Sequence, residues 1–99
     1  MRIRWLDRAE DDLVAIVDYL IERDLAAALR IYEAIRQQVE LLSTQPATGR
    51  VGRVKDTREL VIARTPYLVA YTVDRRIDAM IILRVLHSAR QWPNDLTEG

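Results

Sequence analysis

The chain has 99 residues, enough for one hydrophobic core but not for two, so we expect a single domain over residues 1–99. Apolar residues make up 49% of the sequence, and glycine and proline are scarce, which excludes a largely disordered chain. With no cysteine, one histidine and no glycine-rich phosphate loop, the sequence predicts no disulfide framework, no metal and no cofactor.

The net charge is zero, but the charges are unevenly distributed. Residues 1–49 carry six Lys/Arg against nine Asp/Glu, whereas residues 50–99 carry nine against six. A basic second half can present a local anion-binding surface despite overall neutrality. The N-terminus lacks the apolar segment of a signal peptide, and no stretch is long enough to span a membrane, so we expect a cytoplasmic protein.

The first elements are a short strand and a helix. Residues 3–5 alternate in polarity and predict a strand, and Asp7 with Glu10 forms a D-x-x-E capping box that predicts a helix start. Apolar side chains then recur at helical spacing up to about Glu22 or Arg23.

A second helix follows directly. Asp24 is its expected N-cap, its apolar stripe runs to Leu42, and Pro46 prevents it from continuing. Because the connection is so short, the two helices should form an antiparallel hairpin.

The second half changes to the period of strands. Residues 57–64, 67–73 and 79–86 are rich in β-formers and are separated by Thr65-Pro66 and a charged turn at residues 74–78. Short links predict an antiparallel meander, with residues 50–55 as a candidate for one more short strand. The predicted fold is α+β: a short strand, then a helical hairpin packed on a twisted antiparallel sheet, in the order β-α-α-β-β-β. Arg58, Arg64 and Arg84 are expected to share one surface of this sheet.

The segments "QPATGR", "DTRELVIARTPYLVAYTV" and "IILRVLHSARQWP", in this order behind the helical hairpin, resemble the RelE/ParE superfamily of toxins from type II toxin–antitoxin systems. The resemblance extends from Trp5 to Pro93. It implies a compact toxin that arrests growth when free and that a cognate antitoxin neutralises in a hetero-oligomeric complex.

The resemblance leaves two activities open. RelE-like members cut mRNA in the ribosomal A site, whereas ParE-like members lack that chemistry and poison DNA gyrase. Cleavage through the 2′-hydroxyl needs a general base, a general acid and cations that stabilise the phosphorane, so Arg84, His87 and Arg58 are the catalytic candidates in the ribonuclease interpretation. The basic residues that would contact nucleic acid or another target are Arg50, Arg53, Lys55, Arg64 and Arg90.

Two features favour the ParE-like interpretation. No tyrosine follows Tyr71, although many RelE-like enzymes use a late tyrosine, and strand alternation places Arg84 and His87 on opposite faces unless a bulge intervenes. Arginine is seldom buried unless paired, so Arg84 is either on the surface or bonded to a carboxylate such as Glu59 or Asp78. We therefore expect a gyrase poison; the alternatives are a ribosome-dependent mRNA endonuclease and a binding module without toxicity.

Apolar positions on the helical hairpin are candidates for the antitoxin-binding surface. Leu25, Leu29 and Tyr32 fit such a surface, and they fit the interior equally well.

Overall fold

The computed structural model describes residues 1–88, so the predicted role of Arg90 falls outside the described residues. The elements in chain order are β1 (Arg2–Trp5), α1 (Asp7–Ile21), α2 (Leu25–Leu41), β2 (Arg50–Val51), β3 (Arg58–Val61), β4 (Tyr67–Asp74) and β5 (Ala79–His87). This confirms the predicted α+β fold class, and the additional short strand is present as β2.

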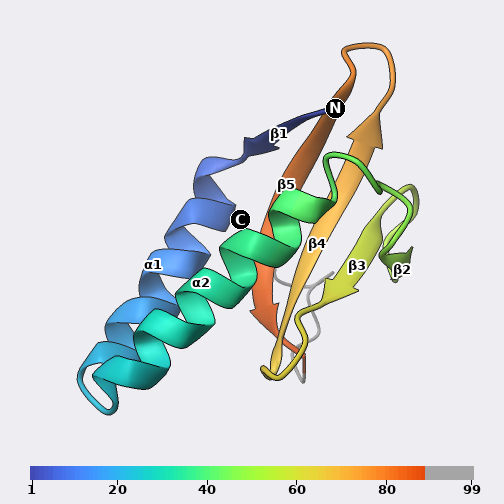
Figure 1. Cartoon of the computed structure of the whole chain (residues 1–99). Coiled ribbons are helices and arrows are strands. Elements are labelled where there is room, and N and C mark those ends of the chain that lie inside the picture. The colour runs from blue at the N-terminus through green and yellow to red at the C-terminus, as the bar shows by residue number, and fades with distance from the viewer. Residues whose placement is uncertain (89–99) are drawn as a thin grey trace.

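The helical hairpin lies against one face of the sheet (Figure 1). The predicted cap of α2 is confirmed, because the Asp24 carboxylate accepts a hydrogen bond from the Ala27 N–H at 3.1 Å. The predicted capping box of α1 is wrong: the N-cap is Leu6, Asp7 is already helical, and no side chain caps this end. The Glu10 carboxylate is engaged by Arg36 of α2 instead, at 3.2 Å, so it joins the two helices.

Apolar side chains from both helices and from one face of the sheet form the main core. Its largest fully buried members include Leu13, Ile35, Tyr71 and Ile82. The stripe on α2 is narrower than its sequence indicates, because Leu29 and Tyr32 lie outside this core, with 59% and 39% of their surface exposed.

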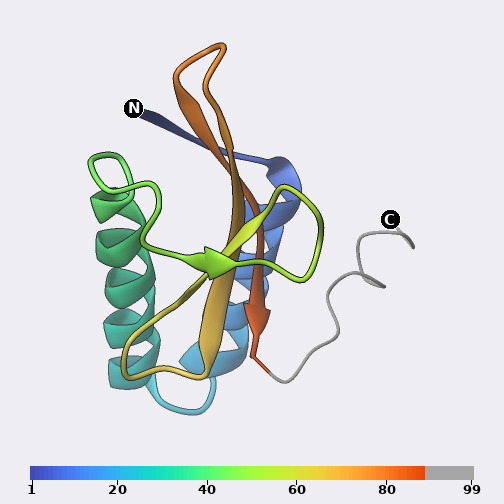
Figure 2. The ribbon, with the colours of Figure 1, turned by 90° about the vertical axis from the view of Figure 1, so that its right-hand side faces the viewer.

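The sheet has five strands in the order β1-β5-β4-β3-β2. Strands β2 to β5 pair antiparallel, as predicted, whereas β1 pairs parallel with the first half of β5. Since β1 ends opposite Ile82, the remainder of β5 forms an edge beside α1. Figure 2 shows α2 on one side of the strands and the loop of residues 52–57 on the other.

A β-bulge determines which residues of β5 face the core. Tyr71 pairs with Ile82 but the adjacent Ala70 pairs with Arg84, so Leu83 is an extra residue on β5. The bulge directs Ile82 and Val85 to the same core and moves Arg84 off that face. Because it precedes Arg84, the expectation that Arg84 and His87 lie on opposite faces holds.

The predicted surface of three sheet arginines is wrong. Arg64 follows the end of β3 in a turn, and Arg58 pairs with Tyr71, whose side chain faces the helices. Arg84 lies in a different row, with Ala70 and Glu59 as its neighbours across the strands.

Candidate functional site

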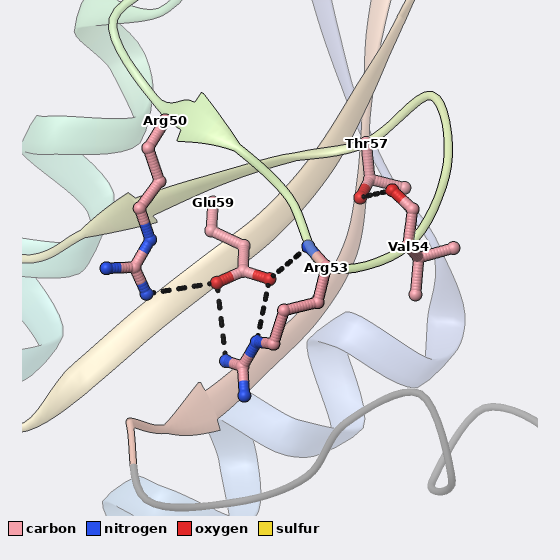
Figure 3. A network of polar contacts seen from close by, with 5 residues as sticks. All are labelled: Arg50, Arg53, Val54, Thr57 and Glu59. Atoms are coloured by element: carbon pink, nitrogen blue, oxygen red, sulfur yellow. Dashed lines mark hydrogen bonds and ion pairs between the residues drawn. The ribbon is translucent and has the colours of Figure 1, made fainter.

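The most concentrated group of charges in residues 1–88 surrounds Glu59 on β3 (Figure 3). This carboxylate is only 1% exposed and accepts hydrogen bonds from Arg50 Nη2 at 3.1 Å, from Arg53 Nε at 3.1 Å and from the Arg53 backbone N–H at 3.0 Å. A buried carboxylate needs such charged partners, because its desolvation costs several kcal/mol. Two arginines around one glutamate leave a local excess of positive charge.

The loop that follows β2 brings Arg53 back to Glu59. It is closed by a hydrogen bond from the Gly52 N–H to the Thr57 carbonyl at 2.8 Å and by one from the Thr57 hydroxyl to the Val54 carbonyl at 2.6 Å. A side chain at position 52 would collide with the Thr57 hydroxyl, so this approach needs glycine. The structure therefore brings together Arg50 and Arg53 and places Lys55 exposed in the same loop.

Arg84 is buried, with 4% of its surface exposed, and forms an ion pair. Its Nε and Nη2 donate to the Asp12 carboxylate of α1 at 2.7 and 3.1 Å. The pairing alternative is therefore confirmed, but neither suggested partner is correct. Glu59 is held by Arg50 and Arg53, and Asp78 lies beyond the other end of β5.

Asp12 also forms a hydrogen bond with the backbone at the edge of β5. Its Oδ2 also accepts the backbone N–H of Val85 at 2.9 Å, beyond the point where β1 ends. The carboxylate thus supplies an acceptor that a neighbouring strand would otherwise provide. In the sequence Asp12 belongs to the acidic run at the start of α1, and nothing local marks it as the partner of a residue 72 positions away.

Arg58 organises the loop before β2. Its Nη1 donates to the Gly49 carbonyl at 2.7 Å and more weakly to the Ala47 carbonyl at 3.4 Å. The neighbouring Tyr71 hydroxyl donates to the Pro46 carbonyl at 2.7 Å and accepts the Gly49 N–H at 2.9 Å. A Cβ at position 49 would lie 2.6 Å from that hydroxyl oxygen, which explains the glycine in "QPATGR".

His87 lies at the end of β5 against Tyr67. The two rings meet edge to face, with centroids 5.7 Å apart. An open hollow of about 420 Å³ lies between α1 and β5, and its lining includes Asp12, Tyr19, Tyr67 and His87. Arg58 is not among the lining residues and is bonded instead to carbonyl oxygens of the loop before β2.

These positions bear on what the site can do chemically. The Arg84 guanidinium is bonded to a carboxylate, Arg58 to carbonyl oxygens, and His87 lies on the opposite face of β5 from Arg84. Each of the three catalytic candidates is thus engaged by a different partner: Asp12, the Gly49 carbonyl and the Tyr67 ring. Within residues 1–88 no cluster of His, Asp or Glu side chains has the composition of a metal site.

The helical hairpin carries a second candidate surface. Leu25 and Leu29 are 58% and 59% exposed, and Tyr32 borders a hollow of about 220 Å³ between the helices, together with Val14 and Arg36. The Arg36 guanidinium stacks over the Trp5 ring, 4.5 Å from its centroid, and its Nε donates a hydrogen bond to the Tyr32 hydroxyl. These two contacts hold Arg36 in place at the edge of the hollow. The three predicted antitoxin-contact residues thus lie on the surface. No helix in the described part of the chain is long and apolar enough to span a membrane.

Two helices on one face of a sheet in the order β1-β5-β4-β3-β2 define a toxin fold of the RelE/ParE superfamily. A chain of the chromosomal ParDE toxin–antitoxin system from P. aeruginosa superposes with a TM-score of 0.78 at 28% identity, over 88% of this chain and 95% of that one.

Sequence comparison identifies the family. The sequence model of the family described as the ParE toxin of the type II toxin–antitoxin system parDE matches residues 3–92. The chain therefore belongs to the ParE toxin family. A putative toxin, Y4kP, from Sinorhizobium fredii is 43% identical over 96% of both chains. Toxin RelE2 from Caulobacter vibrioides is 33% identical over 90% of this chain and 97% of that protein.

Proposed function

We propose that this toxin arrests growth in the cytoplasm by binding and poisoning DNA gyrase, without a catalytic step of its own. The observation that carries this proposal is that Arg84, His87 and Arg58 each have a different structural partner: a carboxylate, an aromatic ring and a carbonyl oxygen. A ribonuclease needs its acid, base and phosphate-binding cations around one phosphate. Membership of the ParE family supports the same choice.

The arginine cluster around Glu59 is the proposed contact surface for the target. Arg50 and Arg53 keep 59% and 41% of their side chains exposed while bonded to Glu59, and Lys55 lies in the adjoining loop. Guanidinium groups held in place lose less entropy on binding an anionic partner than mobile ones.

An mRNA endonuclease is the second candidate. The similarity to a protein named toxin RelE2 and the exposed arginines around Glu59 favour it. In that case Arg50 and Arg53 would contact the phosphates of ribosome-bound mRNA.

One experiment separates the two. The purified toxin is added to gyrase with supercoiled DNA and, in parallel, to a translating extract whose mRNA is analysed by primer extension. We expect cleaved DNA to accumulate only with gyrase present. Arg50→Ala/Arg53→Ala/Glu59→Gln should reduce it at least about tenfold, the effect of losing one charged hydrogen bond, and the Glu59→Gln change avoids leaving a buried carboxylate without its charged partners. Arg75→Ala, which removes a charge from the exposed turn between β4 and β5, is the matched control. Codon-positioned mRNA cuts without gyrase-dependent DNA cleavage would refute the proposal, and unimpaired growth on expression would refute both toxic activities.

We further propose that a cognate antitoxin neutralises the toxin by covering the outer surface of the helical hairpin. Leu25, Leu29 and Tyr32 would be buried in the complex, which follows from their present exposure on one helix. Exposed apolar side chains at four- and three-residue spacing are what an amphipathic partner helix packs against.

A further inference from the structure

An open groove lies between α2 and the turn that joins β3 to β4. Its volume is about 610 Å³. Its lining residues are Arg30, Glu33, Ala34, Gln37 and Gln38 from α2 and Ala63, Arg64 and Thr65 from the turn.

The groove is rich in hydrogen-bond donors. Neither Arg30 nor Arg64 forms an ion pair with any residue in 1–88, and both side chains are exposed. Gln38 accepts the Ala63 N–H through Oε1 at 2.9 Å, which leaves its –NH₂ group as a donor. Glu33 is the one acidic side chain among the lining residues, so the ligand that matches the groove carries acceptors and negative charge.

Arg64 occupies a backbone conformation that favours glycine. Its φ is 66°, in a turn closed by the Thr65 N–H and the Ile62 carbonyl at 3.2 Å. A residue with a Cβ is strained in this left-handed region, and strain of this kind is concentrated at binding sites. Glycine at position 64 would relieve this strain and stabilise the turn. A role of the Arg64 side chain in binding would explain why the sequence has arginine there instead.

We propose that this groove binds an extended acidic segment of a partner protein, with Arg30 and Arg64 pairing with its carboxylates and the glutamine amides with its main-chain carbonyls. A protein segment fits better than nucleic acid, because two arginines beside one glutamate give a net charge of about +1, whereas nucleic-acid sites commonly neutralise several phosphates. We identify this partner as the antitoxin, and this identification rests on the proposed function.

The test uses the full chain labelled with ¹⁵N and an acetylated octaglutamate peptide as the probe. We expect chemical-shift changes at the amides of Gln37, Gln38, Arg64 and Thr65, and none with octalysine. The variant Arg30→Ala/Arg64→Gly should bind octaglutamate at least about tenfold more weakly. It should also unfold at the same or a higher temperature than the wild type, because alanine favours the helix and glycine relieves the turn. Arg75→Ala removes a positive charge from the exposed turn between β4 and β5, and this variant should bind octaglutamate as the wild type does.

Three results would overturn the proposal: no octaglutamate binding, shifts centred on the Arg50 and Arg53 loop instead, or undiminished binding by the double variant. Tighter binding of a 12-base-pair duplex at the same amides would replace it with a nucleic-acid site. A second arm measures the complex with the antitoxin encoded beside the toxin, which the double variant should weaken. If the wild type does not bind that antitoxin, the proposed neutralisation by this antitoxin fails, while the octaglutamate titration still decides the chemistry of the groove.

Discussion

At the scale of single residues, the pairing of Arg84 with Asp12 connects two elements that are far apart in the sequence. The arginine is 4% exposed, so its charge is largely removed from water and depends on the carboxylate 2.7 Å away. The same carboxylate accepts the Val85 N–H, so one side chain satisfies both a buried cation and the edge of β5. Loss of Asp12 leaves three donors, Arg84 Nε, Arg84 Nη2 and the Val85 N–H, without this acceptor, which is costlier than removal of both charged partners.

We predict that Asp12→Ala lowers the free energy of unfolding by about 3–5 kcal/mol, the range for a buried ion pair that has lost one partner. The double variant Asp12→Ala/Arg84→Met should recover a large part of this loss, because no uncompensated charge remains. Urea denaturation of the two single variants and the double variant measures the coupling. The exposed pair Arg76 and Asp74 provides the comparison, since Arg76→Ala should have little effect. A loss below about 1 kcal/mol for Asp12→Ala would contradict the importance given to this ion pair.

At the scale of elements, α2 presents two different surfaces. One buries Ile31, Ile35 and Val39 in the core shared with the sheet, and the other exposes Leu25 and Leu29 near the start of the helix. Leu41, at the other end of α2, is equally exposed at 63%. Leu29 and Leu41 are about 18 Å apart along the helix axis at 1.5 Å per residue, so one of them can test a localised interface and the other can serve as its control.

We predict that Leu29→Asp weakens binding of the cognate antitoxin at least about tenfold, because an interface of this kind depends on a few buried apolar side chains. Leu41→Asp should leave the affinity within about twofold of the wild type, a difference of about 0.4 kcal/mol. Isothermal titration of the purified toxin variants with the antitoxin measures both affinities. Thermal unfolding of the free variants checks that each remains folded, as the exposure of both leucines leads us to expect. Equal effects of the two substitutions would show that the interface is not centred on the first half of α2.

At the scale of the whole molecule, the sequence predicts the elements much better than it predicts their contacts. Periodicity identifies the two helices and the strands β3, β4 and β5, because each signal lies within one segment. Register is different: the bulge at Leu83 reverses which residues of β5 face the core, and no local pattern marks it. The partners of Arg84 and Glu59 follow from that register and from the loop of residues 52–57, so the predicted arginine surface was wrong although the strands were correct.

The long-range contacts of two tyrosines give the folded chain a characteristic response to alkaline pH. Burial raises the pKa of Tyr71 above its ordinary value of 10.0, although the Gly49 N–H and the nearby Arg58 charge oppose this effect. Burial also raises the pKa of Tyr67, with a smaller contribution from Tyr19. Since the chain has no cysteine and Lys55 is its one lysine, tyrosine ionisation dominates the proton release that occurs near pH 10.

The sign of the effect follows from linkage. The folded state holds the Tyr67 and Tyr71 protons more tightly than the unfolded state, so their contribution to stability is fully present below pH 10 and is lost as pH rises through the folded-state pKa values. We predict that absorbance at 295 nm shows Tyr67 and Tyr71 ionising above their ordinary pKa of 10.0. The free energy of unfolding in urea should fall as pH rises above 10, by about 1.4 kcal/mol for each unit by which a pKa is raised. Tyr67→Phe keeps the ring in the core and should reduce this fall, whereas Tyr71→Phe should also destabilise the protein at neutral pH because the Gly49 N–H loses its acceptor. Ionisation of Tyr67 and Tyr71 at their ordinary pKa of 10.0, with an unchanged free energy of unfolding, would contradict the burial of these hydroxyls.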